Sequence, residues 1–116
     1  MTKIIAVDFD GTLCEEAWPG IGKEKSAGIE YVKQKQAAGW KAVLWTCRKG
    51  RRLEEAVKWC GERGIVFDAV NENLPGIIRA FCGDTRKIYA DEYLDDKAVR
   101  PPEKPPENAR GRAKRR

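Results

Sequence analysis

Lys3 to Thr12 reads KIIAVDFDGT, a short β-branched apolar run that ends in two aspartates and a glycine. Such a run predicts a buried strand of a parallel sheet. Alternate residues of an extended strand end point the same way, so the carboxylates of Asp8 and Asp10 are expected to face one site. Gly11 lets the chain turn sharply away after them. This stretch predicts the first strand of an α/β sheet and an acidic site at its carboxyl end.

Strand-like and helix-like segments alternate along the rest of the chain. Further strands are expected over 41–46, 65–70 and 87–94, and helices over 24–38, 51–63 and from Pro75 through Phe81. This alternation predicts a parallel sheet with right-handed crossovers. We expect a three-layer α/β/α Rossmann-like fold with about four strands in the order 4-1-2-3, formed by residues 1–99.

Composition restricts the chemistry. The 116 residues allow one domain, and no apolar run approaches the roughly 18 residues of a membrane helix. The absence of histidine excludes Ser-His-Asp and Cys-His catalysis and histidine-ligated metal centres. The four cysteines form no C-x-x-C pair, so free thiols are expected rather than a zinc site. The apolar run near the N-terminus is too short for a signal peptide, so we expect a cytoplasmic protein.

The end of the chain has a different composition. Residues 100–116 contain a Pro-Pro-Glu-Lys-Pro-Pro-Glu stretch followed by the basic run Arg110–Arg116, with almost no apolar residues. Such a segment predicts a disordered tail. A contact of the basic run with nucleic acid and a purely solubilising role both remain open interpretations.

Polar residues follow the other predicted strands as well. Thr46, Cys47 and Arg48 come after the second strand, and Asp95 and Asp96 come after the fourth. Because ligands of open parallel sheets bind beyond the carboxyl ends of the strands, carboxylates from two strands are expected to gather at one edge. Hard oxygen ligands without histidine indicate Mg²⁺.

This set of residues suits phosphoryl transfer. Asp8 can attack phosphorus while Asp10 handles the proton of the leaving group. Thr46 offers a hydroxyl and a backbone N–H to a phosphate oxygen, and a lysine would neutralise the phosphoryl group. Mg²⁺ would offset the repulsion between the anionic nucleophile and the anionic substrate.

Four motifs resemble those of the haloacid dehalogenase (HAD) superfamily of phosphohydrolases. Asp-Phe-Asp-Gly-Thr at 8–12 resembles the first motif, and the strand ending Leu-Trp-Thr46 resembles the second. Lys87 resembles the third, and Leu94-Asp95-Asp96 resembles the fourth in its double-aspartate form. The resemblance covers about residues 3–97 and implies a HAD-like fold.

The resemblance implies a role for each matching residue. Asp8 would form an aspartyl-phosphate, and Asp10 would act as acid and base. Mg²⁺ would be held by Asp8, by the backbone carbonyl of Asp10, and by Asp95 or Asp96. The residues expected to contact the substrate are Gly11, Thr12, Cys47 and Arg48.

The third motif requires a bend in the chain. Lys87 would lie at the start of a continuous fourth strand, far from the site. A bend around Ala90-Asp91 would bring it closer, and Arg86 is the alternative cation.

Three further interpretations concern residues near the same edge. Arg48 either clamps a substrate phosphate or only solvates the start of a helix. Asn71, Glu72 and Asn73 are interpreted as a polar loop rather than as part of the site. Trp18 is expected to close the edge of the core rather than to stack on a base.

The connections between strands bear on the substrate. A cap domain in this superfamily would be inserted after the first or the third strand, and residues 13–23 and 71–86 are both too short for one. A capless, open site favours a large or extended phosphorylated substrate, or a partner subunit as a lid. A looser similarity to deoxyribonucleotidases and polynucleotide 3′-phosphatases adds a nucleotide or nucleic-acid end phosphate to the candidates, beside a phosphorylated small molecule.

Two other functions fit the same architecture. A response-regulator receiver domain carries its acceptor aspartate at the end of the third strand, where this chain has Ala69-Val70-Asn71. A pseudoenzyme that only binds a partner would usually have lost one of the paired aspartates, and both pairs are intact here. The sequence therefore favours a phosphate monoester hydrolase over either alternative.

Overall fold

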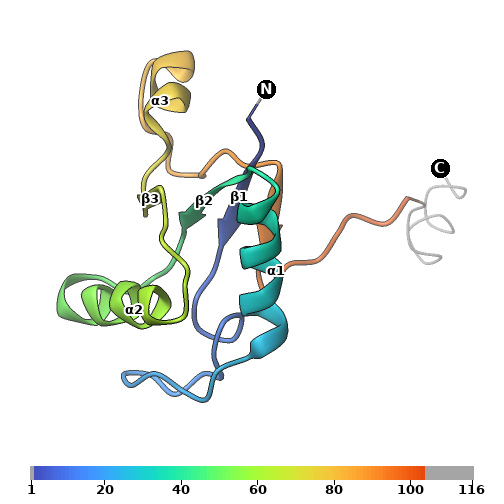
Figure 1. The fold of residues 1–116 in the computed structure, drawn as a ribbon. Coiled ribbons are helices and arrows are strands. Elements are labelled where there is room, and N and C mark those ends of the chain that lie inside the picture. Colours follow the sequence, from blue (N-terminus) through green and yellow to red (C-terminus); the bar gives the residue numbers. More distant parts are fainter. Residues whose placement is uncertain (1, 104–116) are drawn as a thin grey trace, which may run out of the picture.

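The sheet has four parallel strands in the order β3-β2-β1-β4 (Figure 1). The computed structural model describes residues 2–103. Its central strand β1 (Ile4–Val7) pairs with β2 (Lys41–Leu44) on one side and with β4 (Glu92–Leu94) on the other. The edge strand β3 (Ala69–Val70) pairs with β2. This order, read from the opposite edge, is the predicted one.

Two helices cover one face of the sheet, α1 (Ser26–Ala37) and α2 (Gly50–Glu62). Alternate residues of a strand point to opposite faces. Ile5 and Val7 of β1 therefore pack toward this side, in one buried cluster with residues of both helices. The helical contributors to that cluster are Ile29, Val32, Ala56 and Cys60. This face holds the larger part of the core.

The opposite face has a thinner cover, built from α3 (Pro75–Phe81) and the segment that follows it. Ile4 and Ala6 of β1 pack here with the buried Ile88 and the half-buried Ile77. No residue of α3 is fully buried. The three-layer α/β/α arrangement is therefore present, but several aromatic rings on this side stay partly exposed, namely Trp45, Phe81, Tyr89 and Tyr93.

The edge strands are shorter than the sequence predicts, because β3 and β4 begin only at Ala69 and Glu92. The residues that precede them, Asp68 and Asp91, each accept a hydrogen bond from a backbone N–H of the neighbouring strand, at 2.9 Å and 2.8 Å. Each carboxylate thus takes the place of a backbone carbonyl as the first acceptor in the row of hydrogen bonds between the two strands. The predicted strands 65–70 and 87–94 are therefore wrong over residues 65–68 and 87–91.

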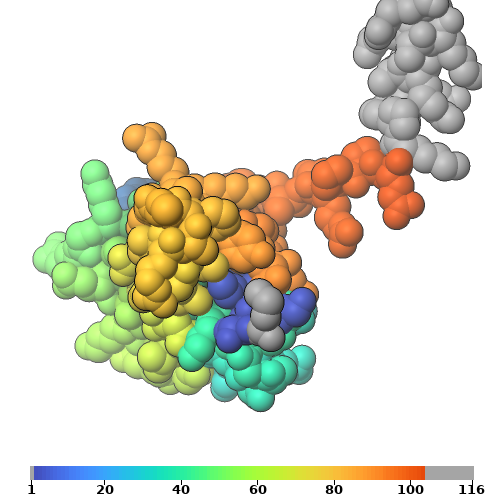
Figure 2. Space-filling model, turned by 90° about the horizontal axis from the view of Figure 1, so that it is seen from above, coloured from blue at the N-terminus to red at the C-terminus, as the bar shows by residue number. Residues whose placement is uncertain are grey.

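After β4 the chain passes the carboxyl edge of the sheet, and its end within the described residues then extends away from the body of the molecule (Figures 1 and 2). Within residues 2–103, neither 13–23 nor 71–86 forms a separate cap domain. No helix in this described part is both long and apolar enough to span a membrane. The predicted nucleic-acid contact through Arg110–Arg116 lies outside the described residues.

Candidate active site

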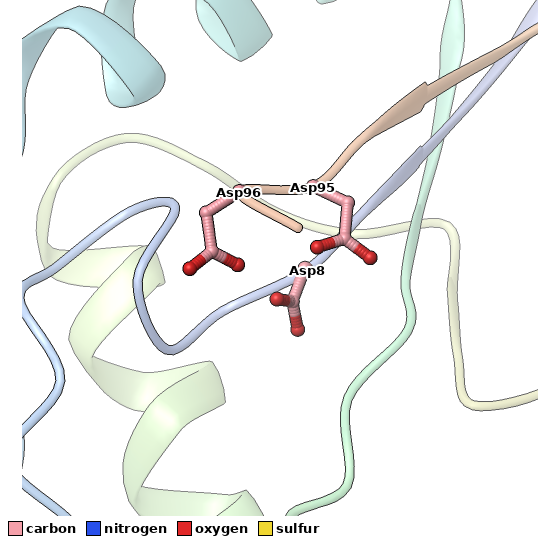
Figure 3. Close-up of side chains that lie close together, drawn as sticks. All are labelled: Asp8, Asp95 and Asp96. Carbon is pink, nitrogen blue, oxygen red and sulfur yellow. The ribbon is translucent and has the colours of Figure 1, made fainter. Parts of the chain in front are cut away.

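Three carboxylates meet at the carboxyl edge of the sheet (Figure 3). Asp8 directly follows β1, and Asp95 and Asp96 directly follow β4. These strands are neighbours, and the N–H of Asp8 donates a hydrogen bond to the carbonyl of Leu94 at 3.0 Å. One oxygen from each carboxylate lies within 4.8 Å of the other two. The predicted convergence of acids from two strands is confirmed.

The surroundings of Asp8 disfavour its charged form. Burial is the main cause that raises the pKa of Asp8, to about 6, and the nearby charges of Asp95, Asp96 and Asp10 raise it further. A hydrogen bond from the backbone at Phe9 acts in the opposite direction. Asp8 therefore needs added positive charge nearby if it is to act as an anion well below neutral pH.

Gly11 and Thr12, predicted to contact the substrate, both lie against Asp96. Gly11 has a φ of +85°, and a side chain there would collide with the Asp96 carboxylate. The hydroxyl of the buried Thr12 accepts a hydrogen bond from the Asp96 N–H at 3.1 Å. The turn after β1 therefore positions the acidic residue that follows β4.

Arg48 differs most from its predicted role. Its side chain is only 1% exposed, and Nε and Nη2 donate to the two carboxylate oxygens of Asp10 at 2.9 and 2.7 Å. Nη1 and Nη2 also donate to the carbonyls of Pro19 and Gly20, at 3.3 and 2.7 Å. A guanidinium held in this way does not face the open edge, which corrects the expectation that Arg48 contacts the substrate.

Thr46 lies in a loop fastened by Asn71, a residue that we interpreted as part of a polar loop. The Asn71 side chain accepts a hydrogen bond from the Thr46 N–H at 2.8 Å and donates to the Arg48 carbonyl at 3.3 Å. The Thr46 N–H is therefore engaged, while its hydroxyl accepts from the Arg48 N–H at 3.2 Å and keeps its own proton to donate. Cys47 between them is an exposed free thiol.

A cavity of about 250 Å³ opens beside Asp8. Asp95 and Lys87 also line it, so the predicted third-motif cation and two of the three carboxylates border the same cavity. This is feasible because β4 begins at Glu92, which leaves the segment before it free to bend. The remaining lining residues are Ala6, Trp45, Tyr93, Leu94 and Ala98, and Thr46 is not among them.

Asn73 shapes the loop that carries Lys87. Its buried side chain donates to Asp84 Oδ1 at 2.8 Å and to the Thr85 carbonyl at 3.1 Å, and it accepts from the Tyr89 N–H at 2.8 Å. These bonds hold the chain on both sides of Lys87. The sequence carried no signal for this role beyond the position of Asn73 shortly after the third strand.

Comparisons with known proteins give one informative match. The chain matches no protein-family model and no curated protein. It is similar to a solved structure, that of a conserved protein from Bacteroides thetaiotaomicron, with 39% sequence identity and a TM-score of 0.74. The match covers 85% of this chain and 79% of the other.

Proposed function

We propose, from the premise that this chain belongs to the same family as the conserved Bacteroides thetaiotaomicron protein, that it is a Mg²⁺-dependent phosphohydrolase of the HAD type. Similarity to that relative implies no particular activity, so the proposal rests on the site. The observation that carries it is the meeting of Asp8, Asp95 and Asp96 within 4.8 Å beside a cavity that Lys87 also lines.

The donor chemistry fits Mg²⁺. Three carboxylates within 4.8 Å of one another repel each other unless a cation joins them, and magnesium prefers such hard oxygen ligands. Asp8, Asp95 or Asp96, and the carbonyl of Asp10 would hold the ion. When bound, it would keep Asp8 ionised and neutralise part of the phosphate charge.

The residues of the chain divide the reaction between them. A carboxylate oxygen of Asp8 attacks phosphorus in line, and the bond to the leaving oxygen breaks as Asp10 donates a proton to it. Water then attacks phosphorus, Asp10 takes a proton from that water, and the bond to Asp8 breaks to release phosphate. Lys87 and the Thr46 hydroxyl donate hydrogen bonds to the phosphoryl oxygens.

The proposed substrate is a phosphate monoester, either a phosphorylated small molecule or the end phosphate of a nucleic acid. The lack of a cap domain within residues 2–103 supports a substrate that extends out of the site. We place the reaction in the cytoplasm, where the four free cysteines would stay reduced.

The direct test is hydrolysis of p-nitrophenyl phosphate by the full chain, with Mg²⁺ and with EDTA. We expect turnover only with Mg²⁺. Full activity in EDTA would refute the metal assignment. A protein that is phosphorylated but releases no phosphate would indicate the receiver-type alternative instead.

A further inference from the structure

The structure assigns Arg48 a function that the sequence does not reveal, namely the positioning of Asp10. This inference rests on the proposed function, in which Asp10 is the acid and base. Arg48 would touch neither the substrate nor the phosphoryl group. It would fix the direction in which the Asp10 carboxylate meets the leaving oxygen and the attacking water.

The geometry of the pair is suited to this role. A bidentate contact, with Nε and Nη2 on the two different oxygens of Asp10, sets the plane of the carboxylate as well as its distance. A single hydrogen bond would leave the carboxylate free to rotate. General acid–base catalysis needs hydrogen-bond reach to the transferred proton, so this rotation matters for the rate.

Arg48 is itself held from several directions. Its guanidinium donates to the carbonyls of Pro19 and Gly20 in the loop that follows the first motif. Its carbon lies 5.1 Å from the Phe9 ring centre and 5.0 Å from that of Trp18. A side chain that positions another must itself be held in one place. These contacts, together with the burial of Arg48, restrict its guanidinium to one orientation.

The alternative roles of Arg48 fit the contacts less well. A substrate clamp needs free N–H groups at the site, and bonds among the described residues use four of the five. A purely stabilising role is a poor explanation, because a buried ion pair is often no more stabilising than apolar side chains of the same volume. The Arg48–Asp10 ion pair is better explained by the orientation that it gives to the Asp10 carboxylate.

The test compares Arg48→Met, Arg48→Lys and, as a control, Arg52→Met, which changes a partly exposed arginine of α2 just after the loop that carries Arg48. Two substrates are used, p-nitrophenyl phosphate with a good leaving group and an alkyl phosphate with a poor one. The readout is release of the alcohol in the first turnover, so that the later hydrolysis of the aspartyl-phosphate does not mask the step.

We expect Arg48→Met to lower the rate of alcohol release from the alkyl phosphate by about 100-fold, since general acid–base catalysis contributes about 10²–10⁴-fold to the rate. The loss with p-nitrophenyl phosphate should be below about 10-fold, because that leaving group needs little proton donation. KM should stay within about twofold, because Arg48 does not bind substrate. Arg48→Lys should recover part of the lost rate, and Arg52→Met should behave as wild type.

A double variant isolates the coupling. If Arg48 acts through Asp10, then Asp10→Asn with Arg48→Met should be no slower than Asp10→Asn alone. The inference would be overturned if the double variant lost as much rate as the product of the two single losses. It would also be overturned if Arg48→Met lost the same rate on both substrates and raised KM. If Arg48→Met fails to fold by circular dichroism, Arg48→Lys in both backgrounds decides the question. Absence of wild-type turnover would overturn the proposed function and this inference together, whereas wild-type turnover with equal losses would overturn this inference alone.

Discussion

At the scale of single residues, the charge of Asp8 contributes to the way in which the stability of the metal-free protein depends on pH. Its pKa is raised to about 6, mainly by burial. Between pH 4 and 6 the folded chain keeps a proton on Asp8 that the unfolded chain has already lost, so the free energy of unfolding falls as pH rises through this window. A bound cation would offset this effect.

We therefore predict that Asp8→Asn is more stable than wild type at pH 7.5 in EDTA, by about 1–2 kcal/mol. This is less than the full shift of pKa would give, because Asp8 is only partly buried. Urea unfolding from pH 4 to 8 would measure it. Glu54→Gln, on the exposed side of α2, is the control and should keep the wild-type pH dependence. Equal pH slopes for wild type and Asp8→Asn would contradict the prediction.

Gly11 offers a second test at this scale. Gly11→Ala should destabilise the fold by about 1–3 kcal/mol, because alanine strains a backbone with positive φ, and it should also weaken Mg²⁺ binding by displacing Asp96. Gly39→Ala is the matched control, since Gly39 has a φ of +95° with no atom near the added carbon. The Gly39→Ala variant should be less stable than wild type but should bind Mg²⁺ with the wild-type affinity, as measured by calorimetry. Equal affinities in the two variants would show that the contact with Asp96 is unimportant.

At the scale of elements, the hydrophobic pattern located each helix and strand of residues 2–103. It placed the starts of the two edge strands too early and the end of the second strand at 46, whereas β2 ends at Leu44. Apolar periodicity reports which residues face a core, and it marks Asp68 and Asp91 only as polar. It cannot show that a side chain replaces a backbone carbonyl in a ladder. The sequence indicated only that a bend before the fourth strand would be needed to place Lys87 beside the cavity. The bend itself depends on the late start of β4 at Glu92 and on the hydrogen bonds of Asn73.

Asn73→Ala tests whether the Lys87 loop depends on this one side chain. The change removes the acceptor of the Tyr89 N–H and one of the two donors to Asp84 Oδ1, so we expect a loss of about 1–3 kcal/mol in stability. Turnover should fall as well, because Lys87 loses its fixed place. Glu72→Ala at the exposed neighbouring position is the control. Unchanged melting and turnover in Asn73→Ala would contradict the role given to Asn73.

At the scale of the whole molecule, the topology was predictable and so was the gathering of acids. Strand order 4-1-2-3 places the first and fourth strands side by side, so Asp8 and Asp95 had to meet at one edge. The partners of single side chains were not predictable in this way. The pairing of Arg48 with Asp10 and the contact of Thr12 with Asp96 depend on how loops distant in sequence fold onto each other.

The most direct test of the proposed mechanism is to locate the phosphoryl group during turnover. The full chain is mixed with p-nitrophenyl phosphate and Mg²⁺, quenched in acid and reduced with borohydride, which converts an aspartyl-phosphate to homoserine. Peptide mass analysis then identifies the modified position. The mechanism predicts homoserine at position 8 in wild type, and in Asp10→Asn as well, because a good leaving group needs little acid catalysis. Homoserine at Asp95 or Asp96, or turnover with no modified aspartate, would contradict it.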